Sequence, residues 1–447
     1  MTTLNCIRVS ALCLALAACA DRPAFGQALH RAAFVANNGN LEGSVSSYRV
    51  NDDGTLTFIM KFVTGSTPST SMPVPGTNAQ TISITPDGRF LMTGHGTSST
   101  TVEQLTVLQV AGDGTLSLAA TFTTPDSPLD VQWLSDQHVA VTHTNLSVPN
   151  EVLVYAFDPQ GPSLTLIDQA PTGSFSSFLA LHPSGEALYA QDSTANTVRA
   201  FHVSADGTLD LIEVEPTPGV FPLGPGISPD GTKLFAGGGI SSGGHAVSGL
   251  HVAPDGSLTL MSGSPFFSPG TSPKQVVVSN DNAWAFVAHG TDSTVRTFAV
   301  DGETGALTET GFLFDVGVQG SLGEIAVLDD WLLVIDRDTL LDGIRGLYSF
   351  TIESDGSLTQ NGPIVDSTGI TPNALAVWSP DVCAGDFDGD CDADLDDHAA
   401  FAACLFGPGF VPMPPAPMTA GLCLAAFDAD DDSDVDAFDF ADFAAAF

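Results

Sequence analysis

The last stretch of the chain carries carboxylates at a spacing that could bind metal ions. Aspartates occupy positions 1, 3, 5, 7, 9 and 12 of a twelve-residue loop that begins at Asp386, and a second loop from Asp428 repeats these positions. Hard oxygen ligands at this spacing wrap one Ca²⁺ ion, with position 7 offering its backbone carbonyl. The sequence therefore predicts two calcium ions, bound by Asp386, Asp388, Asp390, Asp392, Asp394, Asp397, Asp428, Asp430, Asp432, Asp434, Asp436 and Asp439.

An apolar pattern with helical spacing follows each predicted calcium loop. Such a pattern indicates a helix that turns one face toward a core. A solvated acidic run, which is the alternative, would need no apolar residues between and behind its charges. The residues of the two patterns are Phe401, Cys404 and Leu405 behind the first loop and Phe440, Phe443 and Phe447 behind the second.

Four of the seven cysteines lie in this acidic region, and the chain between Cys19 and Cys383 has none. An even number of cysteines in a small exported module suggests two disulfides, for which three connectivities are possible. A bond between Cys404 and Cys423 would close a Pro-rich linker and leave Cys383 to pair with Cys391. Zinc is the alternative ligand for four cysteines, although no CxxC pair is present.

Two calcium loops, each followed by a helix and each with Asp in position 12, resemble the type I dockerin module. The resemblance implies a small α-helical, EF-hand-type domain over residues 381–447 that folds on calcium and docks onto a cohesin-like or cell-surface protein partner. Position 6 is Cys391 or Ser433, where Gly would ease the turn. Positions 10 and 11 are Leu395-Asp396 and Ala437-Phe438, which differ from the Ser-Thr pair common in cohesin contacts.

Upstream of this region, short apolar runs alternate with turn residues in a unit that recurs. In the clearest copy, four strands are predicted at Phe178–Leu181, Ala187–Ala190, Val198–Val203 and Leu209–Val214. The turn between the last two strands recurs at intervals of about fifty residues after a longer first interval, as expected of four-stranded propeller blades. The seven turns begin at Asp53, Asp113, Gly161, Asp206, Asp255, Thr304 and Asp355.

The two ends of the repeat array complement each other. The chain enters at Ala33–Ala36, which matches the second strand of a unit, and Asn373–Trp378 matches a missing first strand. Pairing these segments would close the ring and remove its open edges. The sequence therefore predicts an all-β seven-bladed propeller over residues 27–380.

The blade length, the turn motifs and the closing strand resemble the seven-bladed propeller lactonase family, which includes 6-phosphogluconolactonase. The resemblance covers about Ala33 to Pro380 and implies this fold and lactone hydrolysis. The family commonly has a Pro-Arg-His triplet that opens an inner strand. Pro222-Leu223-Gly224 and Pro273-Lys274-Gln275 occupy that place here, so both Arg and His are absent.

Polar residues gather where inner strands are expected to start and second strands to end, at one mouth of the axial channel. A carboxylate, a histidine and a cation in one concavity could activate water and stabilise an oxyanion. Solvation of the strand ends is the structural alternative for any one of them. The candidates are Gln80, Asp130, Lys274, Gln275, Glu324 and Asn373 at strand starts, and Asn37, His95, His143, Asp192, His289, Asp336 and Arg337 at strand ends, with His143, Lys274, His289 and Glu324 as the catalytic choices.

The charge balance and the N-terminus bear on partners and location. The formal net charge is −40, so a nucleic acid partner is disfavoured by repulsion of its phosphates. Residues 1–26 are predicted to be a signal peptide, because Val9–Ala18 is apolar but too short to span a bilayer. Leu16–Cys19 resembles a lipobox that would anchor the protein by lipid at Cys19, whereas Ala24-Phe25-Gly26 could be an ordinary cleavage site.

The sequence thus favours an exported, secreted or cell-surface propeller that acts mainly as a recognition protein. The calcium module would attach it to its partner, and the propeller mouth would take a small-molecule or carbohydrate ligand. The alternative is a hydrolase that opens a sugar lactone or related cyclic ester at the mouth.

Overall fold

The computed structural model describes residues 30–68, 73–96, 103–144, 150–173, 176–219, 221–238, 244–317, 322–337, 344–380 and 395–405, with residues 412, 413, 423, 427 and 435. The predicted signal peptide, including Cys19, lies outside the described residues. Within the described ranges, no helix is long and apolar enough to cross a membrane.

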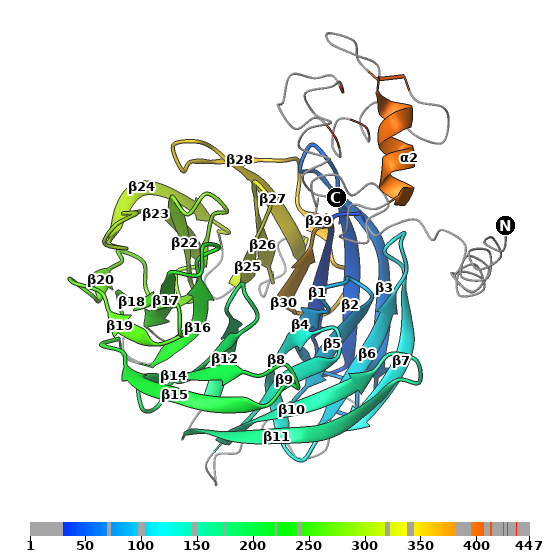
Figure 1. Ribbon diagram of the computed structural model, residues 1–447, viewed down its shortest axis with the longest axis horizontal. Helices are drawn as coiled ribbons and strands as arrows, with labels where there is room; N and C mark the ends of the chain where they lie inside the picture. The colour runs from blue at the N-terminus through cyan, green and yellow to red at the C-terminus, as the bar shows by residue number, and fades with distance from the viewer. Residues whose placement is uncertain are drawn as a thin grey trace, which may run out of the picture.

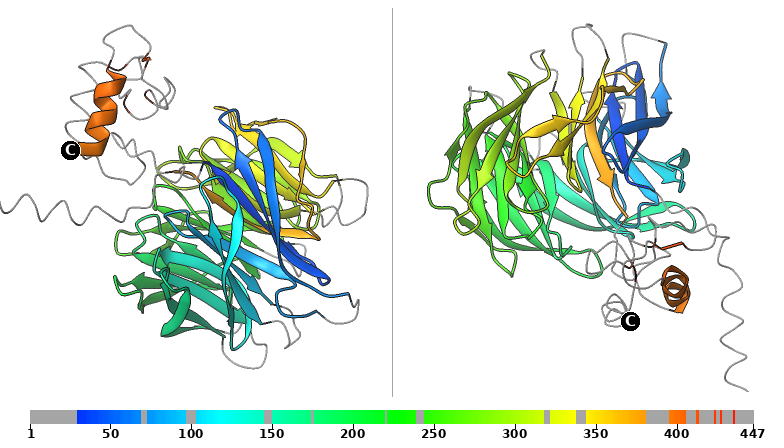
Figure 2. Two further views of the ribbon diagram at one scale, coloured as in Figure 1. Left: turned by 90° about the vertical axis from the view of Figure 1, so that its right-hand side faces the viewer. Right: turned by 90° about the horizontal axis from the view of Figure 1, so that it is seen from above.

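The chain forms a ring of seven antiparallel sheets, and the predicted seven-bladed propeller is confirmed (Figure 1). Each sheet is one blade, and its first strand lies next to the axis. Seen from the side, the strands of each blade cross the thickness of the disc (Figure 2). The repeated turns at about fifty-residue spacing therefore mark blades, as the sequence predicts.

The strands of each blade follow one another from the axis outward. Blade 1 contains β30 (Pro372–Trp378), β1 (Ala32–Asn38), β2 (Glu42–Val50) and β3 (Leu56–Ser66), and blade 2 contains β4 (Ala79–Ile84), β5 (Phe90–His95), β6 (Gln104–Val110) and β7 (Leu116–Thr123). Blade 3 contains β8 (Ser127–Ser135), β9 (His138–Thr144), β10 (Asn150–Asp158) and β11 (Ser163–Gly173), and blade 4 contains β12 (Ser176–Leu181), β13 (Ala187–Asp192), β14 (Thr197–Val203) and β15 (Leu209–Pro216).

The outer strand is interrupted in two of the remaining blades. Blade 5 contains β16 (Pro222–Ile227), β17 (Lys233–Gly238), β18 (Ala246–Val252), β19 (Leu258–Leu260) and β20 (Phe266–Phe267), and blade 6 contains β21 (Pro273–Val278), β22 (Trp284–His289), β23 (Thr294–Val300) and β24 (Leu307–Asp315). Blade 7 contains β25 (Leu322–Leu328), β26 (Trp331–Asp336), β27 (Gly346–Ile352), β28 (Leu358–Gln360) and β29 (Val365–Asp366).

Blade 1 joins the two ends of the repeat array. Strand β30 pairs with β1 in antiparallel register, with Leu375 opposite Val35 and Ala376 opposite Phe34. Side chains alternate between the two faces of a strand. Accordingly, Phe34 packs in the seam with blade 2, whereas Val35 packs in the seam with blade 7. The predicted closing strand is therefore confirmed, and it fills two seams at once.

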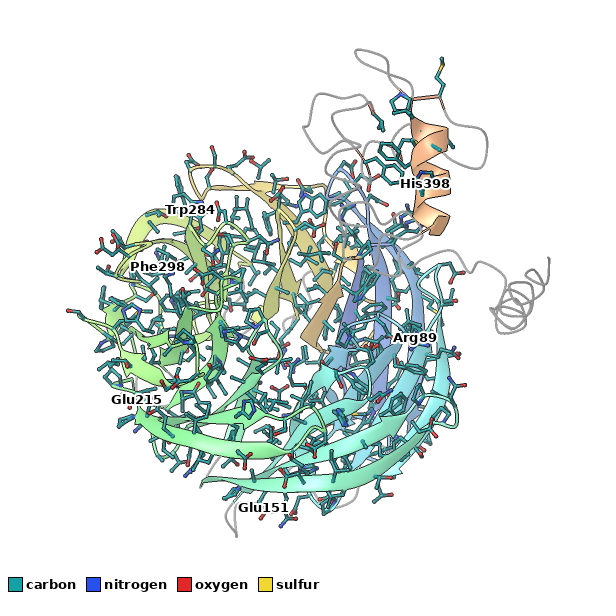
Figure 3. All side chains as sticks on the ribbon, in the orientation of Figure 1. Arg89, Glu151, Glu215, Trp284, Phe298 and His398 are labelled. Carbon is teal, nitrogen blue, oxygen red and sulfur yellow. A yellow bond between two sulfur atoms is a disulfide. The ribbon has the colours of Figure 1, made fainter. Side chains whose placement is uncertain are left out.

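The core of the ring is divided among the seams between blades. In the described chain, each of the seven seams holds one cluster of buried apolar side chains. Phe298 belongs to the seam between blades 5 and 6, and Figure 3 shows it among the strands, while Glu215 lies at the outer rim. This arrangement leaves the axis free of the apolar core and available for a site.

The acidic C-terminal region contributes one described helix, α2 (Leu395–Cys404), directly after the first predicted calcium loop. A disulfide joins Cys404 to Cys423, so this one of the proposed pairings is confirmed. Phe401 and Phe427 are buried and stack edge to face with ring centroids 5.2 Å apart. Cys383 and Cys391 lie outside the described residues.

Candidate functional site

A cavity of about 500 Å³ opens at the mouth where the inner strands start. Residues from six blades line it, which places it around the axis and not within one blade. Pockets of this size accommodate small organic ligands. The lining residues are Leu129, Phe178, Phe221, Leu223, Gly224, Lys274, Gln275, Glu324, Arg337 and Asn373.

A β-bulge near the start of each inner strand explains why these side chains reach the axis. All seven inner strands shift register there, and one or two residues are left without a partner on the second strand. A bulge bends the strand and redirects the extra side chain. The bulged residues include Leu129, Phe178, Gly224, Lys274, Glu324 and Asn373, and each of these lines the cavity.

Side chains at these bulges also bind the next blade. The Glu324 carboxylate accepts a hydrogen bond from the backbone N–H of Leu375 at 2.8 Å. The Gln275 side-chain oxygen accepts one from the N–H of Ile325 at 2.9 Å, and Asp130 of blade 3 accepts one from Leu179 at 2.8 Å. These bonds hold adjacent inner strands together, so the polar residues of the mouth have a structural role.

Glu324 contributes a carboxylate to the lining of the cavity. Burial raises its pKa to about 7, and the nearby Asp130 carboxylate acts in the same direction. The hydrogen bond from Leu375 and the positive charge of Lys274 oppose this rise. A carboxylic acid with a pKa near 7 can both accept and release a proton near neutral pH, which suits general acid–base chemistry.

Two cations face the same cavity. Burial lowers the pKa of Lys274 to about 8, with the Arg337 charge contributing, while the Glu324 carboxylate raises it. Burial also lowers the pKa of Arg337. The Lys274 ammonium donates one hydrogen bond, to the carbonyl of Leu322 at 2.8 Å, and an ammonium has three donors. Lys274 can therefore hold the neighbouring strand and still bind a ligand.

The histidine candidates are outside this cavity. His289 is fully buried, its Nε2 lies 2.7 Å from the Ser268 hydroxyl, and its Nδ1 lies 3.3 Å from the carbonyl of Thr294. His143 is 5% exposed and does not line the cavity. Burial lowers the pKa of both histidines to about 4, so both are neutral at pH 7 and are weak bases.

Asn37 and His289, at the ends of second strands, pack against the connections that enter their blades. A Cβ on Gly270 would lie 2.3 Å from the His289 ring, and one on Gly369 would lie 2.1 Å from the Asn37 side chain. Second strands lie about 4.8 Å further from the axis than first strands, so their ends meet the chain that enters the blade. Asn37, His95, Asp192, Asp336 and Gln80 likewise do not line the cavity. Of the thirteen predicted mouth residues, the structure gathers Lys274, Gln275, Glu324, Asn373 and Arg337 there.

The apolar lining of the cavity was not predicted, because apolar side chains at strand starts resemble those of the core. Leu129 and Phe178 occupy the bulge positions in blades 3 and 4 that Lys274 and Glu324 occupy in blades 6 and 7. Phe221 precedes β16 and adopts a positive φ of 51°. The positions of these residues in the repeat could have indicated that they face the axis.

Most of the predicted calcium ligands lie outside the described residues. These are Asp386, Asp388, Asp390, Asp392, Asp394, Asp428, Asp430, Asp432, Asp434, Asp436 and Asp439. The backbone of Asp397 belongs to α2, which begins at position 10 of the first loop. Val435, at position 8 of the second loop, is fully buried. Among the described residues, no group of three or more potential ligands could hold a metal.

Comparison with known proteins agrees with the seven-bladed propeller fold. Residues 138–238 match the family described as Lactonase, 7-bladed beta-propeller. A search of curated proteins found no match.

Three similar solved structures illustrate the likeness. A functionally unknown protein from Desulfotomaculum acetoxidans is 20% identical, covering 79% of this chain and 100% of its own, with a TM-score of 0.59. The periplasmic gluconolactonase of Pseudomonas aeruginosa is 19% identical over 78% and 99%, and a putative 6-phosphogluconolactonase from Bacteroides uniformis is 18% identical over 78% and 99%, both with TM-scores of 0.59. These neighbours share the seven-bladed fold of the ring, and the family match covers the part of it from β9 to β17.

Proposed function

We propose that the propeller binds a small organic molecule in the axial cavity and opens a cyclic ester there. The observation that carries this proposal is the grouping of Glu324, Lys274 and Arg337 around one cavity of about 500 Å³. The carboxylate is a proton acceptor with a pKa of about 7, and the two cations are suited to stabilise negative charge. The family match and the gluconolactonase neighbours support the same chemistry.

The proposed reaction is a hydrolysis with one water molecule. The Glu324 carboxylate takes a proton from water while the water oxygen attacks the lactone carbonyl carbon. Negative charge develops on the carbonyl oxygen and is stabilised by Lys274 and Arg337. The ring C–O bond then breaks, and the leaving alkoxide receives the proton from Glu324, so the product is a hydroxy acid.

A purely binding propeller is the second candidate, and a specific observation favours it. Glu324 and Lys274 already hydrogen-bond the backbone of the neighbouring blade, at Leu375 and Leu322. The Pro-Arg-His triplet common in the family is replaced here by Pro222-Leu223-Gly224 and Pro273-Lys274-Gln275. In this case the cavity would recognise its ligand without turnover.

The variant Glu324→Gln separates the two candidates. The amide oxygen can still accept the Leu375 N–H, as Gln275 does for Ile325 in the next blade, so the fold should be retained. We expect kcat for lactone hydrolysis to fall about 10²–10⁴-fold, because a general base is lost. The matched control is Glu213→Gln, since Glu213 accepts the Leu258 N–H across another seam at the outer rim. Unchanged turnover in Glu324→Gln would rule out the proposed base.

The wild-type rate should depend on pH in a bell-shaped manner. Glu324 must be ionised to accept a proton, so kcat/KM should rise as pH increases through about 7. Lys274 must be protonated to stabilise the oxyanion, so kcat/KM should fall as pH increases through about 8. The optimum is expected between these values, and Glu324→Gln should abolish the acidic limb.

We further propose that residues 381–447 fold around two Ca²⁺ ions and dock onto a cohesin-like or cell-surface protein. The donor set consists of aspartates, whose hard oxygens calcium prefers. The start of α2 at position 10 of the first loop, the buried Val435 and the Cys404–Cys423 disulfide are consistent with such a module. Asp386 and Asp397 of the first loop, with Asp428 and Asp439 of the second, would hold the ions at positions 1 and 12.

Calcium titration of the full chain tests this module. We expect about two Ca²⁺ ions per chain by isothermal titration calorimetry, since the sequence has two loops. Chelation should lower the helical circular dichroism signal, because close carboxylates repel one another without the ion. Asp386→Asn combined with Asp397→Asn should remove one of the two ions. A spectrum that calcium leaves unchanged would rule out the metal-folded module, and pull-down with calcium tests the partner.

Export is proposed on the N-terminal sequence alone. Residues 1–26 would be removed as a signal peptide, and Cys19 would carry a lipid if its lipobox is used. Mass spectrometry of the mature N-terminus distinguishes these cases, because lipidation leaves Cys19 as the first residue with an added acyl mass. A mature chain that begins at Met1 would contradict export.

A further inference from the structure

The axial cavity is divided into two halves with different chemistry. Blades 3, 4 and 5 contribute the apolar side chains Leu129, Phe178, Phe221 and Leu223. Blades 6, 7 and 1 contribute the polar side chains Lys274, Gln275, Glu324, Arg337 and Asn373. Equivalent bulges of the ring therefore present apolar groups on one side of the axis and charged or amide groups on the other.

The backbone around Phe221 indicates that its aromatic side chain is not there for local stability. The residue directly before an inner strand also has a positive φ at Asn78, Ser272 and Thr371, at 58°, 60° and 56°. This conformation is tolerated best by glycine and asparagine and is disfavoured for bulky or β-branched residues. Phe221 is thus the aromatic exception at a recurring position, and its side chain lines the cavity. Residues that depart from local conformational preferences occur most often at functional positions.

We infer that the cavity takes an amphiphilic lactone, whose ester group faces Lys274, Glu324 and Arg337 and whose aryl or alkyl substituent lies among Leu129, Phe178 and Phe221. This inference rests on the proposed function, because it places the reacting ester beside Glu324. A polyhydroxylated sugar lactone would bury hydroxyl groups against the apolar half, where they would lose their hydrogen bonds to water. An apolar substituent gains from leaving water at the same surface.

Kinetics with three lactones tests the substrate class on the full chain. The probes are 3,4-dihydrocoumarin with an aryl group, δ-decanolactone with an alkyl chain, and glucono-δ-lactone with hydroxyl groups. We expect kcat/KM to favour the two apolar lactones by about tenfold or more, the range in which hydrophobic pockets discriminate. Equal values or a preference for glucono-δ-lactone, each corrected for spontaneous hydrolysis, would overturn the inference.

The variant Phe221→Gly tests the apolar half without straining the backbone, because glycine adopts a positive φ freely. The backbone N–H that donates to the Asn196 side chain at 2.7 Å is retained. We expect kcat/KM for dihydrocoumarin to fall about tenfold, mainly through KM, so that the preference for dihydrocoumarin over glucono-δ-lactone shrinks. Thr368→Gly is the matched control, since Thr368 is exposed, has a φ of 56° and lies outside the cavity. Leu129→Asn provides a second variant on another blade.

Binding of the ring-opened acids separates this inference from the proposed hydrolysis. Isothermal titration calorimetry should detect 3-(2-hydroxyphenyl)propanoate and not gluconate, and Phe221→Gly should weaken the former. If no lactone is turned over but this selectivity holds, the ligand class stands and the hydrolase proposal falls. If lactones are turned over with equal efficiency and neither acid is preferred, the hydrolase proposal stands and the ligand class falls.

Discussion

Two buried histidines at the ends of second strands, His95 and His289, contact the connections that enter their blades. His95 is fully buried, its Nδ1 lies 3.1 Å from the carbonyl of Thr77, and its Nε2 lies 2.9 Å from the Thr106 hydroxyl. Thr77 belongs to the connection that leads into blade 2. Burial lowers the pKa of His95 to about 4, because the charged ring would lose its hydration.

The pH dependence of stability should reveal this histidine. In the unfolded chain His95 binds a proton below about pH 6.5, whereas in the folded chain it stays neutral down to about pH 4. Its contribution to stability is therefore complete above pH 6.5 and is lost as pH falls toward 4.

We expect His95→Gln to be less stable than wild type at pH 7 and the difference to shrink by about 2–3 kcal/mol at pH 4.5. Urea denaturation at pH 7.0, 5.5 and 4.5 measures this difference. The exposed His202 supplies the control variant, His202→Gln. A difference between wild type and His95→Gln that stays constant with pH would contradict the assignment.

The polar half of the site was predictable from the sequence, but its apolar half was not. Charged residues at strand starts and ends are easily recognised in an otherwise apolar repeat. This made it possible to predict Lys274, Glu324 and Arg337. His143 and His289 lie within second strands and do not line the cavity, whereas Arg337 lies one residue beyond the end of its second strand and does. The bulges that turn Leu129 and Phe178 toward the axis depend on pairing between strands, which a single sequence does not reveal.

Turns that join neighbouring strands also pack against the preceding blade. In the Asp-Gly turns between the third and fourth strands of a blade, the glycines have φ values of 75–84°, and an added Cβ would meet a side chain of the preceding blade. At Gly356, with φ of 81°, the Cβ would lie 2.5 Å from the indole ring of Trp284. Gly54 and Gly207 approach Trp331 and His138 in the same way, at 2.4 Å and 2.7 Å. The glycine is therefore needed both for the positive φ of the turn and for close packing in the seam between blades.

A pair of glycine substitutions separates these two roles. Gly356→Ala should suffer both the unfavourable φ and the collision with Trp284. Gly311→Ala, with a φ of 89° and no other atom within 4 Å of the added Cβ, should suffer only the first. We expect Gly311→Ala to cost about 1 kcal/mol of unfolding free energy and Gly356→Ala about 1–3 kcal/mol more. Urea denaturation of both variants measures the difference, and equal costs would show that the seam contact is unimportant.

These turns are also the reason that the element order was predictable. An Asp-Gly pair between apolar runs is a strong hairpin signal, and its recurrence defined the blades before any contact was known. Strand ends were less accurate, since β12 begins at Ser176 and not at Phe178. The interruption of the outer strand in blades 5 and 7 was not predicted, because outer strands depend least on the core.

The ring as a whole depends on one strand from the far end of the chain. Strand β30 places Ala374 and Ala376 in the seam with blade 2 and Leu375 and Val377 in the seam with blade 7. Its backbone N–H at Leu375 also donates a hydrogen bond to the Glu324 carboxylate. Without this strand, β1 would have an open edge and both seams would lose part of their core.

Two truncated chains test this closure. A chain that ends after Pro380 keeps β30, whereas a chain that ends after Thr371 lacks it, and both lack the acidic region. We expect the first to melt cooperatively. The second should lose most of its stability, since burying the side chains of one strand contributes several kcal/mol out of about 5–15 kcal/mol for a whole domain. Circular dichroism melts and gel filtration distinguish a closed ring from an aggregating chain.

A synthetic peptide of residues 372–380 makes the test specific to closure. If β30 acts by completing blade 1, the peptide should restore a cooperative melt to the chain that ends after Thr371, because antiparallel pairing with β1 needs no covalent link. A peptide with Leu375→Asp should fail, since it would bury a charge in the seam with blade 7. A truncated chain that melts like the longer one without any peptide would mean that six complete blades and one incomplete blade hold the ring unaided.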